Sequence, residues 1–188
     1  MRDSSIARLI LLNGPPGIGK STLARKYHAD HALTLVVDFD DLRTLIGGWD
    51  RHGEAGKLAA ALGHSMARAH LLGGHDVIIA AFSVRSRFFA KIDEVVHEAS
   101  AELHEIVLRA EDSSVIERFR RRRTERESQG IPDVAADIPS EDLPGVIGWA
   151  SGELARVAET RPHVRHLRAD GNLDATYARL TDILTSGH

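Results

Sequence analysis

The chain of 188 residues contains no cysteine. This absence excludes disulfide bonds, thiolate catalysis and cysteine-ligated zinc. Long apolar runs are also missing, since segment 6–12 is too short to span a bilayer. The same segment leads into glycines instead of a cleavage site, so we do not expect it to be a signal peptide. The formal net charge of only −3 gives no overall attraction to nucleic acid or to anionic membranes. No membrane partner is expected.

The chain has no internal repeat, and its composition, 43% hydrophobic and 27% charged residues, is that of a globular domain. Its length predicts one domain, residues 1–188. Short apolar runs alternate with helical stretches, which is typical of right-handed crossovers and a parallel sheet covered on both faces. We therefore predict an α/β fold with a five-stranded parallel sheet. The expected strands are 7–12, 33–37, 77–81, 106–109 and 164–167.

The most specific motif is a Gly-x-x-x-x-Gly-Lys-Ser run that follows the first apolar segment and precedes a predicted helix. This strand, loop and helix order is the setting that a phosphate-binding loop requires. Its glycines let the backbone approach phosphate oxygens, and its N–H groups bind anions at the helix N-terminus. The predicted nucleotide-binding residues are Gly14, Pro15, Pro16, Gly17, Ile18, Gly19, Lys20, Ser21 and Thr22.

Two side chains of this loop have predicted roles in catalysis. Lys20 is expected to reach the β- and γ-phosphates, and the Ser21 hydroxyl is expected to bind Mg²⁺. ATP and Mg²⁺ are therefore the expected cofactors, and a cytoplasmic location follows from this chemistry. The motif does not distinguish ATP from GTP.

Carboxylates follow the second predicted strand, in the order Asp38-Phe39-Asp40-Asp41. In open parallel sheets, ligands bind beyond the carboxyl ends of the strands. Strand alternation would place Asp38 and Asp40 on the same side, where Asp40 is a suitable base for an acceptor hydroxyl. The alternative is that Asp40 or Asp41 caps the helix that begins near residue 42.

An arginine-rich helix is predicted from about residue 117, followed by a proline-rich acidic segment that ends near residue 144. We expect this insertion, 117–144, to form a helical lid over the nucleotide. Arg118, Arg122 and Arg126 fall on one helix face, where they would stabilise phosphoryl charge. Two alternatives are a solvated helix paired with glutamates, and nucleic-acid binding, which the acidic segment 133–142 weakens.

Together, these segments resemble the small P-loop kinases and phosphotransferases. The group includes polynucleotide 5′-hydroxyl kinases, chloramphenicol phosphotransferases, tunicamycin-resistance proteins, zeta toxins, and shikimate and gluconate kinases. The resemblance implies that Asp40 is the base and that Arg43 contacts a substrate phosphate. It also implies that Asp38 helps to bind substrate, or Mg²⁺ through water, and that the lid arginines act as predicted. Ala80-Ala81 departs from the acid or amide that many of these kinases carry after the third strand.

Three weaker signals concern the surroundings of this site. Trp49 lies in the region expected to cover the acceptor, where it would stack on a ring or, more simply, pack. His64 and Arg68 share a helix face and are expected to line one pocket. Residues 170–172 form a predicted turn, either beside the nucleotide base or as a plain helix cap.

The sequence therefore predicts an ATP-dependent phosphotransferase that acts on a hydroxyl of a small molecule, such as an antibiotic or a metabolite. The expected partners are a nucleotide and a small-molecule acceptor. One alternative is a polynucleotide 5′-hydroxyl kinase, for which nucleic acid would be the partner. A second is a nucleotide-binding resistance or switch protein with little turnover. The sequence specifies neither the acceptor nor the oligomeric state.

Overall fold

A computed structural model describes residues 6–135 and 138–186. The ends of the predicted domain, 1–5 and 187–188, and the lid residues 136 and 137 lie outside this description. The strands are β1 (Arg8–Asn13), β2 (Leu35–Asp38), β3 (Val77–Ala81), β4 (Glu102–Arg109) and β5 (Arg165–Arg168). The helices are α1 (Lys20–Asp30), α2 (Phe39–Thr44), α3 (Ala55–Leu72), α4 (Ser86–Ala99), α5 (Asp112–Ser128), α6 (Leu143–Thr160) and α7 (Leu173–Thr185).

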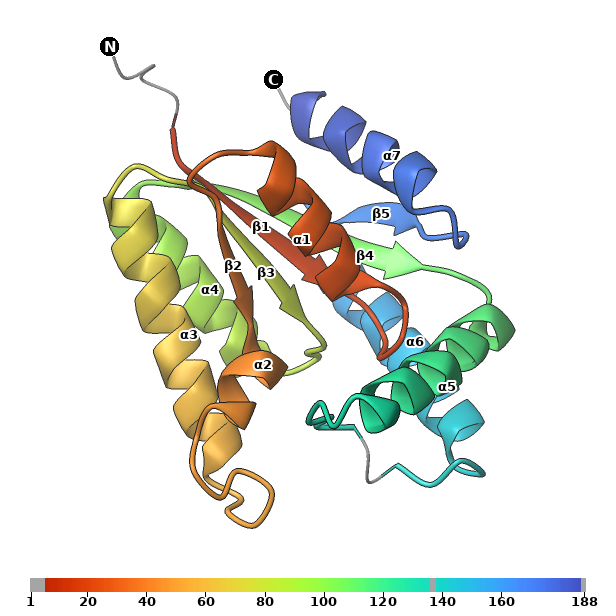
Figure 1. Ribbon diagram of the computed structural model, residues 1–188. Coiled ribbons are helices and arrows are strands. Elements are labelled where there is room, and N and C mark those ends of the chain that lie inside the picture. Colours follow the sequence, from red (N-terminus) through yellow and green to blue (C-terminus); the bar gives the residue numbers. More distant parts are fainter. Residues whose placement is uncertain (1–5, 136–137, 187–188) are drawn as a thin grey trace.

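The strands form one five-stranded sheet in the described residues, in the order β2-β3-β1-β4-β5. All four neighbouring pairs are parallel, with Leu11 of β1 opposite Ile79 of β3 and Glu105 of β4. The predicted α/β fold is therefore confirmed (Figure 1). None of the helices in residues 6–135 and 138–186 is long and apolar enough to cross a membrane.

The sheet separates two hydrophobic cores, because alternate residues of each strand point to opposite faces. On one face, Ile10 and Leu12 of β1 join a cluster with residues of α1, α5 and α7. On the other face, Leu9 and Leu11 pack with residues of α3 and α4. All four β1 side chains are at most 1% exposed. Burial of each contributes about 1.5–3 kcal/mol, so β1 is central to the stability of both cores.

The predicted strand boundaries differ most at β4, which begins at Glu102 instead of residue 106. Polar residues obscured its first half in the sequence, yet Glu105 is buried there. Its carboxylate accepts hydrogen bonds from Arg161 Nε at 2.7 and 2.8 Å, which satisfies the buried charge. The predicted strand 77–81 agrees with β3, which has no polar residue.

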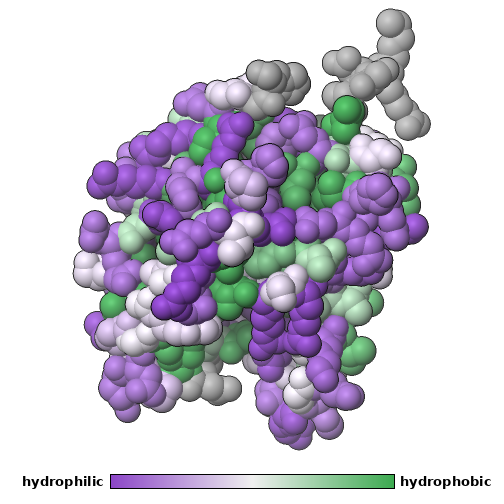
Figure 2. Space-filling view, turned by 180° about the vertical axis from the view of Figure 1, so that it is seen from behind, coloured by the Kyte–Doolittle hydropathy of each residue, from purple (hydrophilic) through white to green (hydrophobic). Residues whose placement is uncertain are grey.

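The carboxyl ends of β1, β2 and β3 lie at one edge of the sheet, between the α2–α3 side and the α5–α6 side (Figure 1). The surface seen from behind is indented at its lower edge between two lobes, and hydrophilic side chains are prominent there (Figure 2). This edge is where ligands bind in open parallel sheets. The fold thus brings the glycine-rich loop after β1 and the carboxylates after β2 to one place.

Candidate functional site

The loop between β1 and α1 has the backbone geometry that its sequence predicts. Gly17 and Gly19 have φ values of 84° and 108°, and α1 begins at Lys20. Residues that carry a side chain rarely adopt a positive φ, so glycine is required at both positions. The Ile18 N–H donates to the carbonyl of Pro15 at 3.3 Å, which folds the loop onto itself. The amide groups of the loop and of the α1 N-terminus form a site suited to phosphate.

Lys20 lies inside this loop. Its Nζ donates hydrogen bonds to the carbonyls of Gly14 and Pro15 at 2.8 and 3.1 Å. Burial disfavours the charged form and lowers the pKa of Lys20 to about 8, although Asp40 and Asp38 act in the opposite direction. A half-buried ammonium whose hydrogen bonds go only to neutral carbonyls is a favourable site for an anionic ligand.

Asp38 is the residue that connects the loop with α2. The Ser21 hydroxyl donates to Asp38 Oδ2 at 2.6 Å, the length of a charge-assisted hydrogen bond. The other carboxylate oxygen of Asp38, Oδ1, accepts hydrogen bonds from the backbone N–H groups of Asp40, at 3.0 Å, and Asp41, at 3.5 Å. Asp38 is therefore the N-cap of α2, and the expectation that Asp40 or Asp41 is the cap is wrong.

The strand-alternation argument for Asp38 and Asp40 is also wrong, because β2 ends at Asp38 and α2 begins at Phe39. Both carboxylates nevertheless line one cavity, since the helical turn returns Asp40 toward the loop. Desolvation and then the charge of Asp38 raise the pKa of Asp40, while Lys20 and Arg122 lower it. Asp40 remains open to the cavity, so water moderates this shift.

The loop and its neighbours fit a nucleoside triphosphate with a divalent cation. Positive φ at Gly17 and Gly19 and the inward Lys20 match the needs of phosphates. The hydroxyl of Ser21 and the carboxylate of Asp38 are hard oxygen donors, the kind that Mg²⁺ prefers. Ala80 and Ala81 supply no ligand at the end of β3, but Asp38 places a carboxylate beside Ser21 from the adjacent strand.

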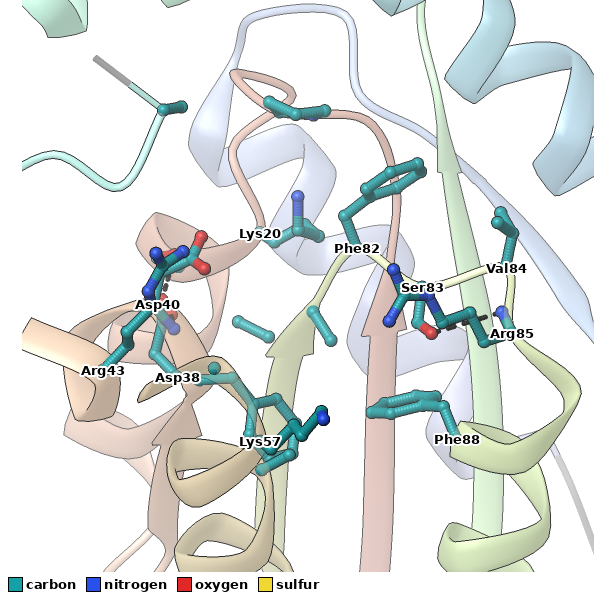
Figure 3. A pocket seen from close by; sticks show the side chains of 18 of the residues that line it. Lys20, Asp38, Asp40, Arg43, Lys57, Phe82, Ser83, Val84, Arg85 and Phe88 are labelled. Carbon is teal, nitrogen blue, oxygen red and sulfur yellow. Dashed lines mark hydrogen bonds between the residues drawn. The ribbon is translucent and has the colours of Figure 1, made fainter. Parts of the chain in front are cut away.

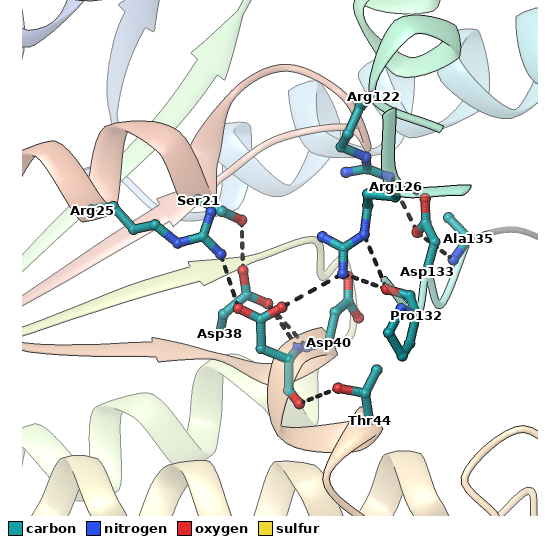
Figure 4. A network of polar contacts seen from close by, with 11 residues as sticks. Ser21, Arg25, Asp38, Asp40, Thr44, Arg122, Arg126, Pro132, Asp133 and Ala135 are labelled. Atoms are coloured by element: carbon teal, nitrogen blue, oxygen red, sulfur yellow. Dashed lines mark hydrogen bonds and ion pairs between the residues drawn. The ribbon is translucent and has the colours of Figure 1, made fainter. Parts of the chain in front are cut away.

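Two of the three arginines of the predicted lid, Arg122 and Arg126, lie beside this site on α5. Arg122 NH2 is 3.4 Å from both oxygens of Asp133, and its guanidinium lies 5.0 Å from the centre of the Phe119 ring. Arg126 donates to the carbonyl of Pro132 and is 4.0 Å from Asp41 on α2 (Figure 4). Arg122 lines the cavity, whereas Arg126 joins the lid to α2 beside it. The pairing of Asp133 with Arg122 could not be predicted from the sequence.

Arg118 lies on the same helix but points elsewhere. Its NH1 donates to the carbonyl of Ala169 at 3.1 Å, next to the turn after β5. In that turn, Asn172 accepts from the Ala175 N–H and caps α7, while Asp170 pairs with Arg179 at 2.9 Å. Asn172 therefore caps α7, as the cap alternative predicts, and Arg118 joins α5 to this turn.

A cavity of about 750 Å³ opens beside Lys20. Lys20, Asp38 and Arg43 line it with side chains from the start of α4 (Figure 3). This size suits a small-molecule acceptor. The polar and charged lining residues are Lys20, Ser21, Asp38, Asp40, Arg43, Lys57, His64, Ser83, Arg85, Arg87 and Arg122.

The aromatic side of the cavity does not include Trp49, for which the packing alternative holds. Trp49 packs over the guanidinium of Arg43 at 5.5 Å and does not line the cavity. Trp149 of α6 does line it, and its ring meets that of Phe82 edge-on at 5.9 Å. The exposed fraction of Trp149 is 54%, which is high for tryptophan. This exposure could not be predicted from the sequence alone. Of the other predicted pair, His64 lines the cavity and Arg68 instead pairs with Glu98.

Gly17→Ala is expected to destabilise the protein through contact between the loop and α5. A Cβ at residue 17 would lie 2.7 Å from Phe119 Cβ and 3.1 Å from its Cα. Strain at positive φ and overpacking each cost about 1–3 kcal/mol, so the free energy of unfolding should fall by about 2 kcal/mol or more. Gly19→Ala is the control, since φ is also positive but no atom lies within 4 Å. Equal losses in urea denaturation would show that the contact with α5 contributes nothing.

Comparison with known proteins identifies the family. A model of the AAA domain family matches residues 9–142, which include the loop, the acidic segment and most of the predicted lid. The chain belongs to this family. A search of curated proteins found no match.

Solved structures share the fold of this AAA domain at low sequence identity. A candidate kinase from Chloroflexus aurantiacus has a TM-score of 0.66 and 16% identity, covering 99% of this chain and 100% of that one. The tunicamycin resistance protein of Deinococcus radiodurans has a TM-score of 0.57 and 18% identity, covering 96% and 95%. A chain of the Pnkp1/Rnl/Hen1 RNA repair complex has a TM-score of 0.60 and 20% identity, covering 82% and 47%. The AAA domain therefore has a P-loop kinase fold, as the sequence resemblance implied.

Proposed function

We propose that this AAA domain is an ATP-dependent phosphotransferase that transfers the γ-phosphoryl group to a hydroxyl of a small molecule. The observation that carries the proposal is the position of Asp40, whose carboxylate faces a cavity of about 750 Å³ that also contains Lys20 and Ser21. A base and a phosphate-binding loop that share one cavity can bring an acceptor hydroxyl and a phosphoryl group together. An ATP-dependent reaction of this kind places the protein in the cytoplasm.

In the proposed reaction, the backbone of loop 14–22 binds the triphosphate and Lys20 stabilises charge on its terminal phosphate. Asp40 orients the acceptor hydroxyl and accepts its proton as the oxygen attacks phosphorus. Arg122 moves from Asp133 toward the transferring group, and Arg126 stays beside Asp41 to hold the lid against α2. Ser21 and Asp38 would hold Mg²⁺, which neutralises phosphate charge when bound. Arg118 lies beside the turn after β5 and would contact the nucleoside.

The alternative function is a polynucleotide 5′-hydroxyl kinase. It is favoured by Arg43, which lines the cavity three residues after Asp40, where a substrate phosphate would bind. One of the structural neighbours belongs to an RNA repair complex, which is consistent with this alternative. The formal charge of −3 and the size of the cavity favour a small molecule instead.

The experiment that tests the proposal is a transfer screen with γ-labelled ATP and Mg²⁺. A panel of hydroxyl-bearing small molecules and a single strand with a 5′-hydroxyl are incubated with the wild type and with Asp40→Asn. Transfer to a small molecule by the wild type alone supports the proposal. Transfer only to the oligonucleotide supports the alternative. If ATP binds and no acceptor is labelled, the proposed activity is wrong and a switch with little turnover is favoured.

Asp38→Asn is expected to raise the Mg²⁺ concentration required for half-maximal transfer by about tenfold or more. The reason is that an amide is a weaker ligand for Mg²⁺ than a carboxylate, and β3 supplies no acid in compensation. Asparagine is as good an N-cap as aspartate, so α2 should stay intact. Transfer measured against Mg²⁺ concentration tests this. An unchanged Mg²⁺ requirement would leave Asp38 with a capping role alone.

A further inference from the structure

The acceptor side of the cavity carries positive charge that the proposed catalytic step does not use. Lys57 comes from α3, and Arg85 and Arg87 from the start of α4, and all three line the cavity. Among the residues that the structure describes, none of the three forms an ion pair with a carboxylate. Lys57 and Arg85 project into the cavity from different walls (Figure 3). These cations have no intramolecular function that accounts for them.

The arginines at the start of α4 interact unfavourably with the helix dipole. A helix N-terminus carries partial positive charge, which favours acidic side chains in the first turn. In α4, Arg85 is the N-cap residue and Arg87 lies in the first turn, while no acid is present there. The Phe88 N–H donates to the carbonyl of Arg85 at 2.9 Å, but no side chain caps the helix, so the N–H groups of Ser86 and Arg87 stay available. Such a local conflict is typical of a binding site, where an anion relieves it.

The start of α3 faces the same cavity. Lys57 lies in its first turn, and Gly53 and Gly56 also line the cavity. A Cβ added at either glycine would meet no atom within 4 Å, so a ligand has room beside the backbone. Glu54, at the N-cap position, makes no cap hydrogen bond and does not line the cavity.

A second, independent observation is a buried polar atom without a partner in the wall of the cavity. His64 is only 8% exposed, lines the cavity, and its Nε2 has no hydrogen-bond partner among the described residues. Its ring packs between Phe39 and Phe88, at 5.3 and 5.8 Å between ring centres. A buried ring nitrogen without a partner costs free energy unless a ligand bonds to it. The Nε of Arg43, also in this cavity, is likewise buried without a partner.

The nucleotide would not neutralise the three cations. The triphosphate site is formed by the loop before α1, where Lys20 and Arg122 provide the positive charge. Lys57, Arg85 and Arg87 come from α3 and α4, on the other side of the sheet from α1. Asp38 is bonded to Ser21. Asp40 is therefore the carboxylate that remains available between the triphosphate site and the three cations.

We propose that the acceptor carries an oxyanion, a carboxylate or a phosphate, which binds at the N-terminus of α4 to Arg85 and Arg87 and across the cavity to Lys57. The acceptor hydroxyl then lies toward Asp40, and a polar group between them bonds to His64 Nε2. This inference rests on the proposed function, since it names the class of its substrate. It assigns specificity to residues that have no role in ATP binding.

Amide NMR titration tests the anion site without requiring turnover. The protein is first saturated with a non-hydrolysable ATP analogue and Mg²⁺, so that the loop before α1 is occupied. Inorganic phosphate, malonate and neutral glycerol are then added separately. Phosphate or malonate should give saturable shifts centred on the amides of residues 56–57 and 86–88, and glycerol should not. The stronger of the two anions identifies the chemistry of the group.

Matched variants give this titration its control. Arg85→Gln and Arg87→Gln should each raise the anion dissociation constant about tenfold, the effect of losing one charge-assisted contact. Lys91→Gln, which removes an exposed cation of α4 that pairs with Glu94, should leave it unchanged. The melting temperature of the two variants should not fall. The Arg85 and Arg87 side chains are exposed, and their positive charge is unfavourable at a helix N-terminus. Equal affinities in all variants, or shifts spread over the surface, would overturn the proposal.

Transfer assays separate this inference from the proposed function. Glucose, glucuronate and glucose 6-phosphate provide one pyranose scaffold with a neutral group, a carboxylate and a phosphate at C6. Preference for a charged acceptor, lost in Arg87→Gln but kept in Lys91→Gln, supports the inference. Equal transfer to the neutral acceptor overturns the inference and leaves the phosphotransferase in place. Saturable anion shifts without transfer to any acceptor would support the anion site and reject the activity.

Discussion

Lys20→Ala is expected to reduce the affinity for ATP–Mg²⁺ by about 100-fold or more and to abolish transfer. The Nζ of Lys20 lies inside the loop that we propose binds the phosphates, where it donates to the carbonyls of Gly14 and Pro15. Loss of charge-assisted contacts to phosphate costs about 2–5 kcal/mol in such a desolvated site, and each 1.4 kcal/mol is tenfold in affinity. Calorimetric titration of both proteins measures the difference.

The control for this substitution is Lys26→Ala, on the same helix but directed at Asp174 and the Tyr177 ring. It should leave ATP affinity unchanged. Equal affinity of the wild type and Lys20→Ala would reject the role of Lys20. The substitution should not unfold the protein, because the native state holds the Lys20 ammonium at a cost that alanine removes.

The same cost predicts a pH dependence of stability in the protein without nucleotide. The pKa of Lys20 falls from its ordinary 10.5 to about 8 in the folded state. Between these values the unfolded chain binds more protons than the folded one, so the Lys20 contribution to the free energy of unfolding rises with pH. This rise should be missing in Lys20→Ala, as urea denaturation at several pH values would show.

Asp40→Asn is expected to reduce transfer by about 10²–10⁴-fold while ATP affinity stays within a few-fold. The amide preserves the shape of the side chain but cannot accept the acceptor proton. The pKa of Asp40 is raised by desolvation and by Asp38, so the wild-type rate should fall with decreasing pH at a value above the ordinary 3.8. That acidic limb should be absent from the residual activity of Asp40→Asn.

Asp41→Asn is the matched control for Asp40→Asn. Asp41 is the next residue of α2, but it pairs with Arg25 at 3.0 Å and does not line the cavity. Transfer by this variant should fall by at most a few-fold, because near the cavity the substitution weakens only the pairing with Arg126 that holds the lid against α2. If Asp40→Asn transfers phosphate at the wild-type rate, Asp40 is not the base and the proposed reaction loses its proton acceptor.

Local sequence was sufficient where function depends on neighbouring residues. The loop 14–22 could be recognised because its glycines, Lys20 and Ser21 form one site within a single strand–loop–helix unit. The strand 77–81 could be recognised because a strand buried on both faces is apolar throughout. By contrast, β4 was shortened in the prediction, because a buried Glu105 is explained only by Arg161, which lies 56 residues later.

The acidic segment shows that two residues can share a cavity through a geometry other than the one expected from the sequence. Alternation in an extended strand was the argument for placing Asp38 and Asp40 together, but the chain becomes helical at Phe39. Asp38 is both the cap of that helix and the partner of Ser21, and neither role is visible from its neighbours in sequence. Asp40 reaches the cavity because the cap fixes the direction of α2.

The sequence by itself determined the α/β class, the phosphate-binding loop and the presence of carboxylates after β2, since each is specified by contiguous residues and by strand periodicity. The tertiary structure decided which side chains line the cavity. Lys57, Arg85 and Trp149 come from three helices and meet only because parallel strands end at one edge of the sheet. The physical reason is that charge and packing act through space, so cations far apart in the chain create one site when the fold leaves them without internal partners.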